Sequence, residues 1–221
     1  MRPDTILAFD TSAAHCAAAL LSDGRIVAAR TESMEKGQAE RLIPLLEEVL
    51  AEAGLAWRDL TALAVGTGPG NFTGIRISVS AARGLALGLG IPALGVTRLE
   101  ALAHGLPRPL RVVEDARRGS VYVQGFGLPP ETACLMTAEA AAALTRGMVA
   151  GSGAALIGAT PLPSAPIAEA IAWIAATRTG IPQPRPAPFY LRSADAAPPS
   201  DPPPVILDPV IPTPAIVETV R

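Results

Sequence analysis

The residues best suited to chemistry lie where an apolar run, residues 60–65, meets a glycine-rich turn, residues 66–74. Glycine allows positive φ and close approach to a ligand, and the first N–H groups of a following helix favour an anion. The turn matches neither common nucleotide loop, because no Lys follows its last glycine and Asn71 replaces the third glycine of a dinucleotide fingerprint. The candidate anion-binding residues here are Gly68, Gly70, Asn71, Thr73 and Arg76.

A second polar group follows the first apolar run, residues 5–9. Asp10, with the hydroxyls of Thr11 and Ser12, could hold a hydrated metal ion or a phosphate at the end of a strand. The alternative is an Asx-turn, in which Asp10 accepts a hydrogen bond from the backbone two residues further on. Because the glycine turn leaves a neighbouring strand, we expect both groups at the same edge of the sheet.

Catalytic and metal-binding patterns are weak elsewhere in the chain. His15 and His104 are the only histidines and no Gly-x-Ser-x-Gly motif occurs, so we expect two surface or hydrogen-bonded structural histidines. Cys16 and Cys134 lack the spacing of a zinc site and are expected to be free thiols. The sequence therefore predicts no catalytic set and no metal site.

Composition limits the class of protein. The chain has 221 residues, of which 49% are hydrophobic, enough for one large domain or two lobes that share a core. A formal net charge of −2 and 4% aromatic residues do not favour a protein that binds nucleic acid alone. We expect no signal peptide and no membrane span, because the first apolar run is short and Arg76 and Arg83 interrupt the most apolar helix. The expected location is the cytoplasm.

Hydrophobic periodicity predicts an α/β fold with mixed sheets. The helix after the glycine turn is apolar almost all round, and its small residues recur at every fourth position, which allows another helix to come close. That ridge predicts either core packing in the monomer or contact with another chain. The expected strands are 5–9, 16–21, 26–31, 60–65, 93–96, 110–113, 120–126 and 147–150, and the expected helices are 38–53, 73–89, 138–145 and 166–177.

Three regions are expected along the chain. Residues 1–105 form an N-terminal lobe and residues 106–192 a smaller C-terminal lobe. Residues 193–221 are rich in proline, which excludes regular helix and central strand, and form a tail.

Several segments together resemble the TsaB (YeaZ) family, in order and spacing, over residues 5–192. The resemblance implies an actin-like, ribonuclease-H-like fold of two lobes, with mixed sheets flanked by helices. It also implies a part in making threonylcarbamoyladenosine (t6A) at position 37 of tRNA. The segments are Asp-Thr-Ser at 10–12, the glycine block at 66–76, Asp-Ala-Arg-Arg-Gly at 115–119, Val-Tyr at 121–122 and Pro-Phe-Tyr-Leu-Arg at 188–192.

The TsaB family resembles the catalytic subunit TsaD and is similar to a degenerate form of it. TsaD carries a metal-binding pair of histidines, which this chain lacks. The resemblance therefore implies a subunit that is not an enzyme by itself, pairs with TsaD through its two N-terminal helices and is joined by the ATPase TsaE. It implies indirect contact with tRNA, a homodimer when alone, and no cofactor except ATP or ADP at the interface of the complex. The implied partner surface is Leu42, Leu45, Leu46 and Val49 with Ser80, Gly84, Leu87 and Gly88.

Two other functions remain open at this point. An actin-like ATPase or small-molecule kinase acting alone would use Asp10 and the glycine turn in one cleft, with Asp115 as the second acidic ligand of Mg²⁺. A peptidase ranks last, because no nucleophile and base stand out.

Overall fold

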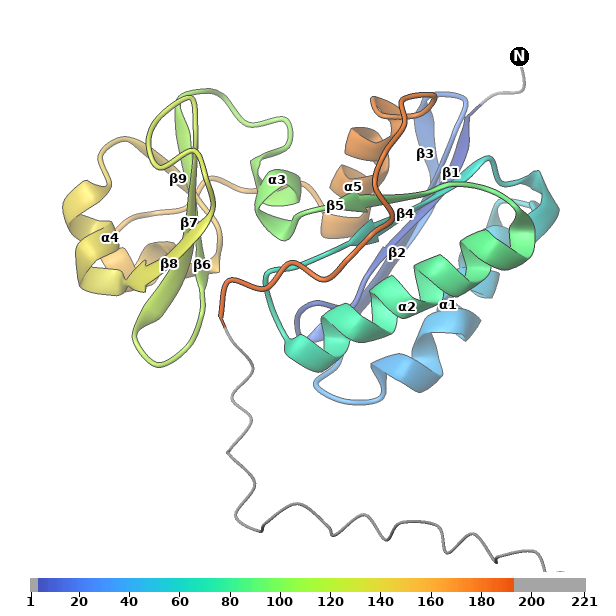
Figure 1. Ribbon diagram of the computed structural model, residues 1–221, viewed down its shortest axis with the longest axis horizontal. Coiled ribbons are helices and arrows are strands. Elements are labelled where there is room, and N and C mark those ends of the chain that lie inside the picture. Colours follow the sequence, from blue (N-terminus) through green and yellow to red (C-terminus); the bar gives the residue numbers. More distant parts are fainter. Residues whose placement is uncertain (1–3, 193–221) are drawn as a thin grey trace, which may run out of the picture.

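The computed structural model describes residues 4–192, which form two lobes side by side (Figure 1). The first lobe is built on a five-stranded sheet in the order β3-β2-β1-β4-β5, and the second on a four-stranded sheet in the order β8-β7-β6-β9. The predicted tail, residues 193–221, lies outside the described residues.

The first sheet begins as an antiparallel meander and continues with parallel strands. β1 (Thr5–Asp10), β2 (His15–Ser22) and β3 (Arg25–Ser33) pair antiparallel, whereas β4 (Ala62–Gly66) and β5 (Ala93–Val96) run parallel to β1. All six residues of β1 are buried, as expected of a central strand covered on both faces. This order and direction confirm the ribonuclease-H-like topology of the predicted fold.

Helices cover both faces of this sheet (Figure 1). Alternate residues of a strand point to opposite faces, so Phe9 joins the core under α1 (Gln38–Glu52) and α2 (Phe72–Leu89), whereas Ala8 joins the core under α5 (Ile167–Ala176). Both long N-terminal helices lie within a residue of their predicted bounds. A short 3₁₀ helix, η1 (Trp57–Asp59), leads into β4.

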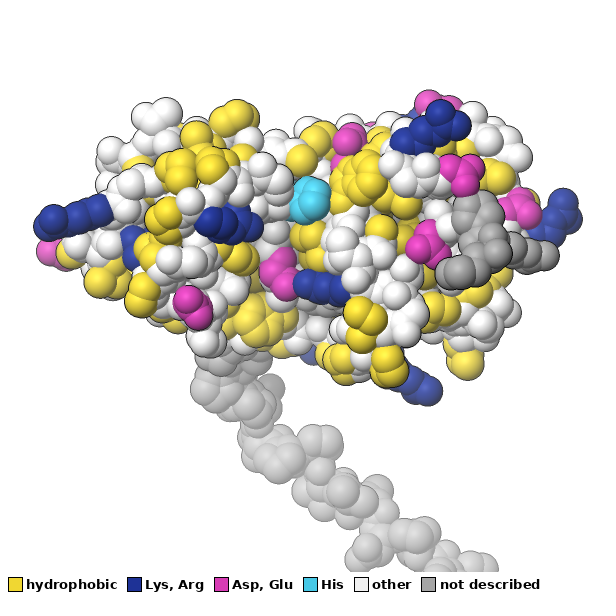
Figure 2. Space-filling view, turned by 90° about the horizontal axis from the view of Figure 1, so that it is seen from above, with side chains coloured by type: hydrophobic (Ala, Val, Ile, Leu, Met, Phe, Trp, Pro, Cys, Tyr) yellow, Lys and Arg dark blue, Asp and Glu magenta, His cyan; other side chains and the backbone are white. Residues whose placement is uncertain are grey.

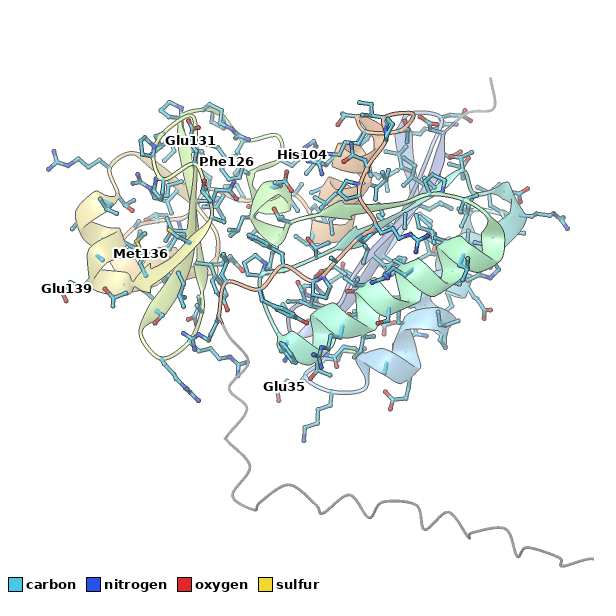
Figure 3. All side chains as sticks on the ribbon, in the orientation of Figure 1. Glu35, His104, Phe126, Glu131, Met136 and Glu139 are labelled. Atoms are coloured by element: carbon cyan, nitrogen blue, oxygen red, sulfur yellow. The ribbon has the colours of Figure 1, made fainter. Side chains whose placement is uncertain are left out.

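The second lobe also has a core on each face of its sheet. Figure 3 labels one side chain of each: Phe126, which packs in the cluster that contains Leu99, and Met136, which packs in the cluster that contains Ala141. Its elements are α3 (Arg98–Ala103), β6 (Leu110–Asp115), β7 (Ser120–Phe126), β8 (Cys134–Thr137), α4 (Ala138–Leu144), β9 (Met148–Ala150) and the 3₁₀ helix η2 (Ser152–Ile157).

The predicted limit of the C-terminal lobe, residues 106–192, is wrong. α5 packs against β1 and β2 of the first sheet, and its Ile171 is fully buried beside Ile6. The chain then stays with the first lobe, where the Phe189 N–H donates to the Thr67 carbonyl (2.8 Å). The first lobe is therefore formed by both ends of the described chain, and the second lobe is an insertion between them.

The surface carries no dominant charge on the face shown in Figure 2, where basic, acidic and hydrophobic side chains are interspersed. A continuous basic stripe is the usual mark of a surface that binds nucleic acid. In the described part of the chain, the helices are too short or too polar to cross a bilayer.

Candidate functional site

The glycine turn lies against the end of β1, as the sequence predicts. A Cβ on three of its glycines would collide with that end: Gly66 with the Asp10 carboxylate, Gly70 with the Ser12 carbonyl and Gly74 with the Thr11 carbonyl. Two hydrogen bonds fasten the contact, from the Asn71 N–H to the Ser12 carbonyl (2.7 Å) and from the Thr11 hydroxyl to the Gly74 carbonyl (2.7 Å). These glycines therefore allow the turn to pack closely against the end of β1, and not against a ligand.

The start of α2 is capped by its own sequence. The Asn71 side chain accepts a hydrogen bond from the Gly74 N–H (2.9 Å), which satisfies one of the groups that could bind an anion. The Arg76 guanidinium lies 4.0 Å from the centroid of the Phe72 ring, which is stacked on Tyr190. Arg76 therefore makes a cation–π contact within the chain.

Asp10 is completely buried, and its oxygen Oδ2 has several partners. It accepts hydrogen bonds from the Ser12 N–H (3.1 Å) and hydroxyl (2.8 Å) and lies 2.8 Å from His15 Nε2. The Ser12 N–H bond is the Asx-turn that the sequence left open as the alternative to an ion site. Burial alone would raise the pKa of Asp10, but the His15 hydrogen bond and the Arg98 charge outweigh it and hold this pKa below its ordinary value of 3.8.

Ser12, His15 and Asp10 do not form a catalytic triad. In a triad the histidine lies between the serine and the carboxylate. Here the Ser12 hydroxyl and His15 Nε2 both meet the same oxygen of Asp10, and Ser12 is fully buried. His104 lies beyond α3, on the side of the molecule away from the start of α2 (Figure 3). This arrangement does not support the peptidase hypothesis.

Arg98, the first residue of α3, lies between the two lobes. Its Nε donates to Glu114 Oε2 on β6 (2.7 Å), and its Nη1 lies 3.9 Å from Asp10 Oδ2 on β1. The exposed fractions of these side chains are 14% for Arg98, 8% for Glu114 and 1% for Asp10. Burial alone would lower the pKa of Arg98, but the charges of Glu114 and Asp10 raise it overall. Arg98 therefore remains a cation.

Asp115 is not the carboxylate that faces Asp10 across the lobes, contrary to the prediction. It is exposed, and its Oδ1 accepts the Arg117 N–H (2.6 Å) in the turn between β6 and β7. The preceding residue, Glu114, is buried and meets Arg98 instead. Consecutive strand residues point to opposite faces, so only one of the two could enter the junction.

The structure divides the predicted site residues into two groups. Asp10, Thr11, Ser12 and Gly68 are buried together, whereas Gly70, Asn71, Thr73, Arg76 and Asp115 are exposed.

No metal site or pocket forms around these residues. Within the described residues, no group of three or more His, Cys, Asp and Glu side chains has the arrangement of a metal site. A hollow of 340 Å³ lies elsewhere, where β4 and β5 begin, and none of the predicted residues lines it.

The apolar stripe of α1 is not a docking surface. Leu42, Leu45, Leu46 and Val49 are at most 1% exposed and pack in the core with Phe9. Their helical spacing marks the face that covers the sheet, so this half of the predicted partner surface is wrong.

The ridge of α2 lies outside the core. Ser80, Gly84 and Gly88 are exposed, and Leu87 is 84% exposed. A Cβ at Gly84 or Gly88 would meet no other atom within 4 Å. Core packing in the monomer therefore does not explain these residues, and their contact with a partner stays a prediction.

Comparison with known proteins decides the family. The family model described as TsaD, tRNA N6-adenosine threonylcarbamoyltransferase, matches residues 26–175. The solved structure of YeaZ from Pseudomonas aeruginosa is similar at 30% identity and a TM-score of 0.67, and the match covers 79% of this chain and 92% of that one. The chain belongs to the TsaB (YeaZ) family, which is related to TsaD.

Two further relatives place the chain within the TsaB family. A Pseudomonas aeruginosa structure described as similar to peptidase YEAZ matches with a TM-score of 0.73 and 29% identity, covering 86% of this chain and all of that one. The tRNA threonylcarbamoyladenosine biosynthesis protein TsaB of Escherichia coli K12 is 42% identical over 122 residues, 53% of this chain and 52% of that protein. The chain spans about half the length of the curated TsaB relatives it matches.

Sequence reasoning missed the two residues that complete the junction of this TsaB family member. Arg98 lies in α3, which at six residues is too short to show a helical period. A signal was present, since Thr97 and Glu100 have the spacing of a capping box, and the structure shows both of its hydrogen bonds. No sequence pattern singled out Glu114, because Glu114 and Asp115 are adjacent at the end of β6 and either could face the junction.

Proposed function

We propose that this chain is a cytoplasmic, noncatalytic subunit that activates TsaD in the transfer of a threonylcarbamoyl group to adenosine 37 of tRNA. The observation that carries the proposal is the exposed ridge of α2, a face of small and apolar residues that no other part of residues 4–192 covers. The names of the similar TsaB proteins, which assign them to t6A biosynthesis, supply the pathway.

The proposed contact is helix against helix. Gly84 and Gly88 have no side chains, so a partner helix can approach the backbone of α2 closely. Covering Leu87, which is 84% exposed, contributes about 1.5–3 kcal/mol. Because the chain matches the TsaD family model, TsaD is expected to offer an equivalent helix, and the two proteins would pair as near copies do across a two-fold axis.

The proposal also covers the homodimer and the other members of the complex. Without TsaD, two copies of this chain are expected to pair through α2 as a homodimer. In the complex, TsaE joins, ATP or ADP binds at an interface, and TsaD contacts the tRNA. The interspersed charges on the face of Figure 2 support an indirect role toward RNA.

The test is the Gly84→Arg variant, mixed with TsaD from the same organism and analysed by size exclusion with light scattering. Gly84 is exposed within α2, and an exposed helical glycine costs about 0.5–1 kcal/mol relative to alanine, so the substitution does not threaten the fold. We expect the wild-type chain to co-elute with TsaD, and the variant to elute separately with an unchanged circular dichroism spectrum.

The matched control is Ala142→Arg, which adds the same side chain at an exposed position of α4 in the other lobe. It should co-elute with TsaD as the wild type does. Separate elution of the wild type and TsaD, with nucleotide present, would count against the proposal, as would a Gly84→Arg variant that still pairs.

A further inference from the structure

The junction between the lobes contains a cation supplied by the chain itself. Asp10 ends β1 of the first lobe and Glu114 lies on β6 of the second, and Arg98 is the side chain that meets both. We propose that the Arg98 guanidinium takes the place of a metal-bound nucleotide between the lobes, and that this junction therefore binds no magnesium nucleotide. The proposal concerns the junction only and does not depend on docking through α2.

Charge balance supports this assignment. Buried carboxylates require a counter-charge, because removal from water strongly disfavours an unpaired ion. Glu114 is held by the Arg98 Nε–H (2.7 Å) and by the Ser152 N–H (2.6 Å), so both of its oxygens have partners. Asp10 has His15 at Oδ2 with Arg98 nearby. Arg178 is bonded instead to Glu100 and to the Gly95 carbonyl.

The residues around Asp10 do not fit a magnesium nucleotide. A metal ligand offers free carboxylate oxygens to the ion, but Asp10 Oδ2 already accepts from Ser12 and meets His15. Asp10 Oδ1 is buried against the backbone of Gly66, where a Cβ would collide with it. The space in which a glycine loop would hold a phosphate is also filled, because the carbonyls of Thr11 and Ser12 lie against Gly74 and Gly70.

The two links made by Arg98 differ in kind. Its bond to Glu114 has hydrogen-bond length, whereas 3.9 Å from Nη1 to Asp10 Oδ2 exceeds that length by about 1 Å. Arg98 Nη1 and Asp10 Oδ1 are both buried without a hydrogen-bond partner among the described residues. The Arg98 backbone N–H is fixed to the first lobe by a hydrogen bond to the Gly68 carbonyl (2.7 Å). Its side chain is hydrogen-bonded to the second lobe and is linked to Asp10 mainly by charge.

The first experiment titrates the wild-type chain with magnesium ADP, magnesium ATP and Mn²⁺ alone by isothermal calorimetry. The expected result is no binding at the junction, seen as no heat or as binding that Asp10→Asn leaves unchanged. Magnesium nucleotide binding that Asp10→Asn abolishes would overturn the proposal. This experiment needs no variant at Arg98, so it remains decisive even if substitution there prevents folding.

The second experiment restores the missing cation from solution. Arg98→Ala leaves two buried carboxylates facing a guanidinium-sized space, and we expect its melting temperature to fall by about 10 °C. Millimolar guanidinium chloride should raise it again, relative to sodium chloride at equal concentration. The control is Arg178→Ala, which removes a partly exposed arginine paired with Glu100 and should gain nothing from guanidinium. An Arg98→Ala variant that melts like the wild type, or is not rescued, would contradict the proposal.

Discussion

At the scale of single residues, Asp10 shows how this junction keeps a buried charge. Its carboxylate is inaccessible to water, yet its pKa lies below the ordinary value because His15 and Arg98 stabilise the ionised form. A strand-end aspartate next to a glycine turn has the pattern of an ion-binding site. Here the same position holds an internal network of hydrogen bonds and ion pairs.

The pH dependence of stability should report this network. Because folding lowers the pKa of Asp10, its contribution is fully present above the ordinary value of 3.8 and is lost as pH falls through the lower, folded-state pKa. We therefore expect the gap in melting temperature between the wild type and Asp10→Asn to be largest near neutral pH and to shrink at strongly acidic pH. Differential scanning calorimetry across this range measures it.

Asp23→Asn is the control for that series. Asp23 is exposed in the turn between β2 and β3 at a φ of 51°, a backbone conformation that Asn tolerates. Its melting temperature should follow the wild type at every pH. A gap for Asp10→Asn that stays constant down to the acid limit would show that the Asp10 charge does not contribute to stability.

At the scale of elements, α2 has two faces with opposite requirements. Its first turn packs against the end of β1, where Gly74 leaves no room for a Cβ because the Thr11 carbonyl is there. Ten residues later, almost three turns along the helix, Gly84 faces open space. Packing within the chain therefore requires glycine at position 74 but not at position 84.

The pair Gly74→Ala and Gly84→Ala separates these roles. Overpacking at Gly74 should lower the free energy of unfolding by about 1–3 kcal/mol, because the added methyl group collides with backbone atoms of Thr11. Gly84→Ala should raise it by about 0.5–1 kcal/mol, because alanine favours the helix and meets no neighbour. Urea unfolding followed by circular dichroism measures both, and changes of the same sign would refute the division of α2 into two faces.

The elements themselves could be predicted from the sequence wherever periodicity or a turn was strong. β5 and β7 have the predicted bounds, and both long N-terminal helices end within a residue of them. The direction in which an apolar stripe faces could not be predicted, because the spacing of Leu42 and Leu46 is the same for a core face and a docking face. Short elements such as β8 were missed for lack of a period.

At the scale of the whole molecule, the chain passes from the first lobe to the second and returns. The sequence places α5 after the second lobe, but the structure packs it beneath β1 and β2. That contact joins residues more than 140 positions apart, and nothing in the local sequence of an alanine-rich helix indicates which sheet it covers. The junction could not be predicted for the same reason, because Arg98 and Asp10 are far apart in sequence and meet only in the folded chain.

The return of α5 predicts which lobe loses stability when that helix is weakened. Ile171→Ala should cost about 2–5 kcal/mol, because it leaves a cavity against Ile6 in the first sheet, whereas Ile181→Ala, at a side chain 57% exposed, should change stability by less than about 0.5 kcal/mol. Trp57 packs against the first-lobe core on the other face of the same sheet, so its fluorescence in a Trp173→Phe background reports that lobe. If α5 is part of the first lobe, the Trp57 transition shifts to lower urea with Ile171→Ala. A shift confined to signals from the second lobe would show that the helix belongs there instead.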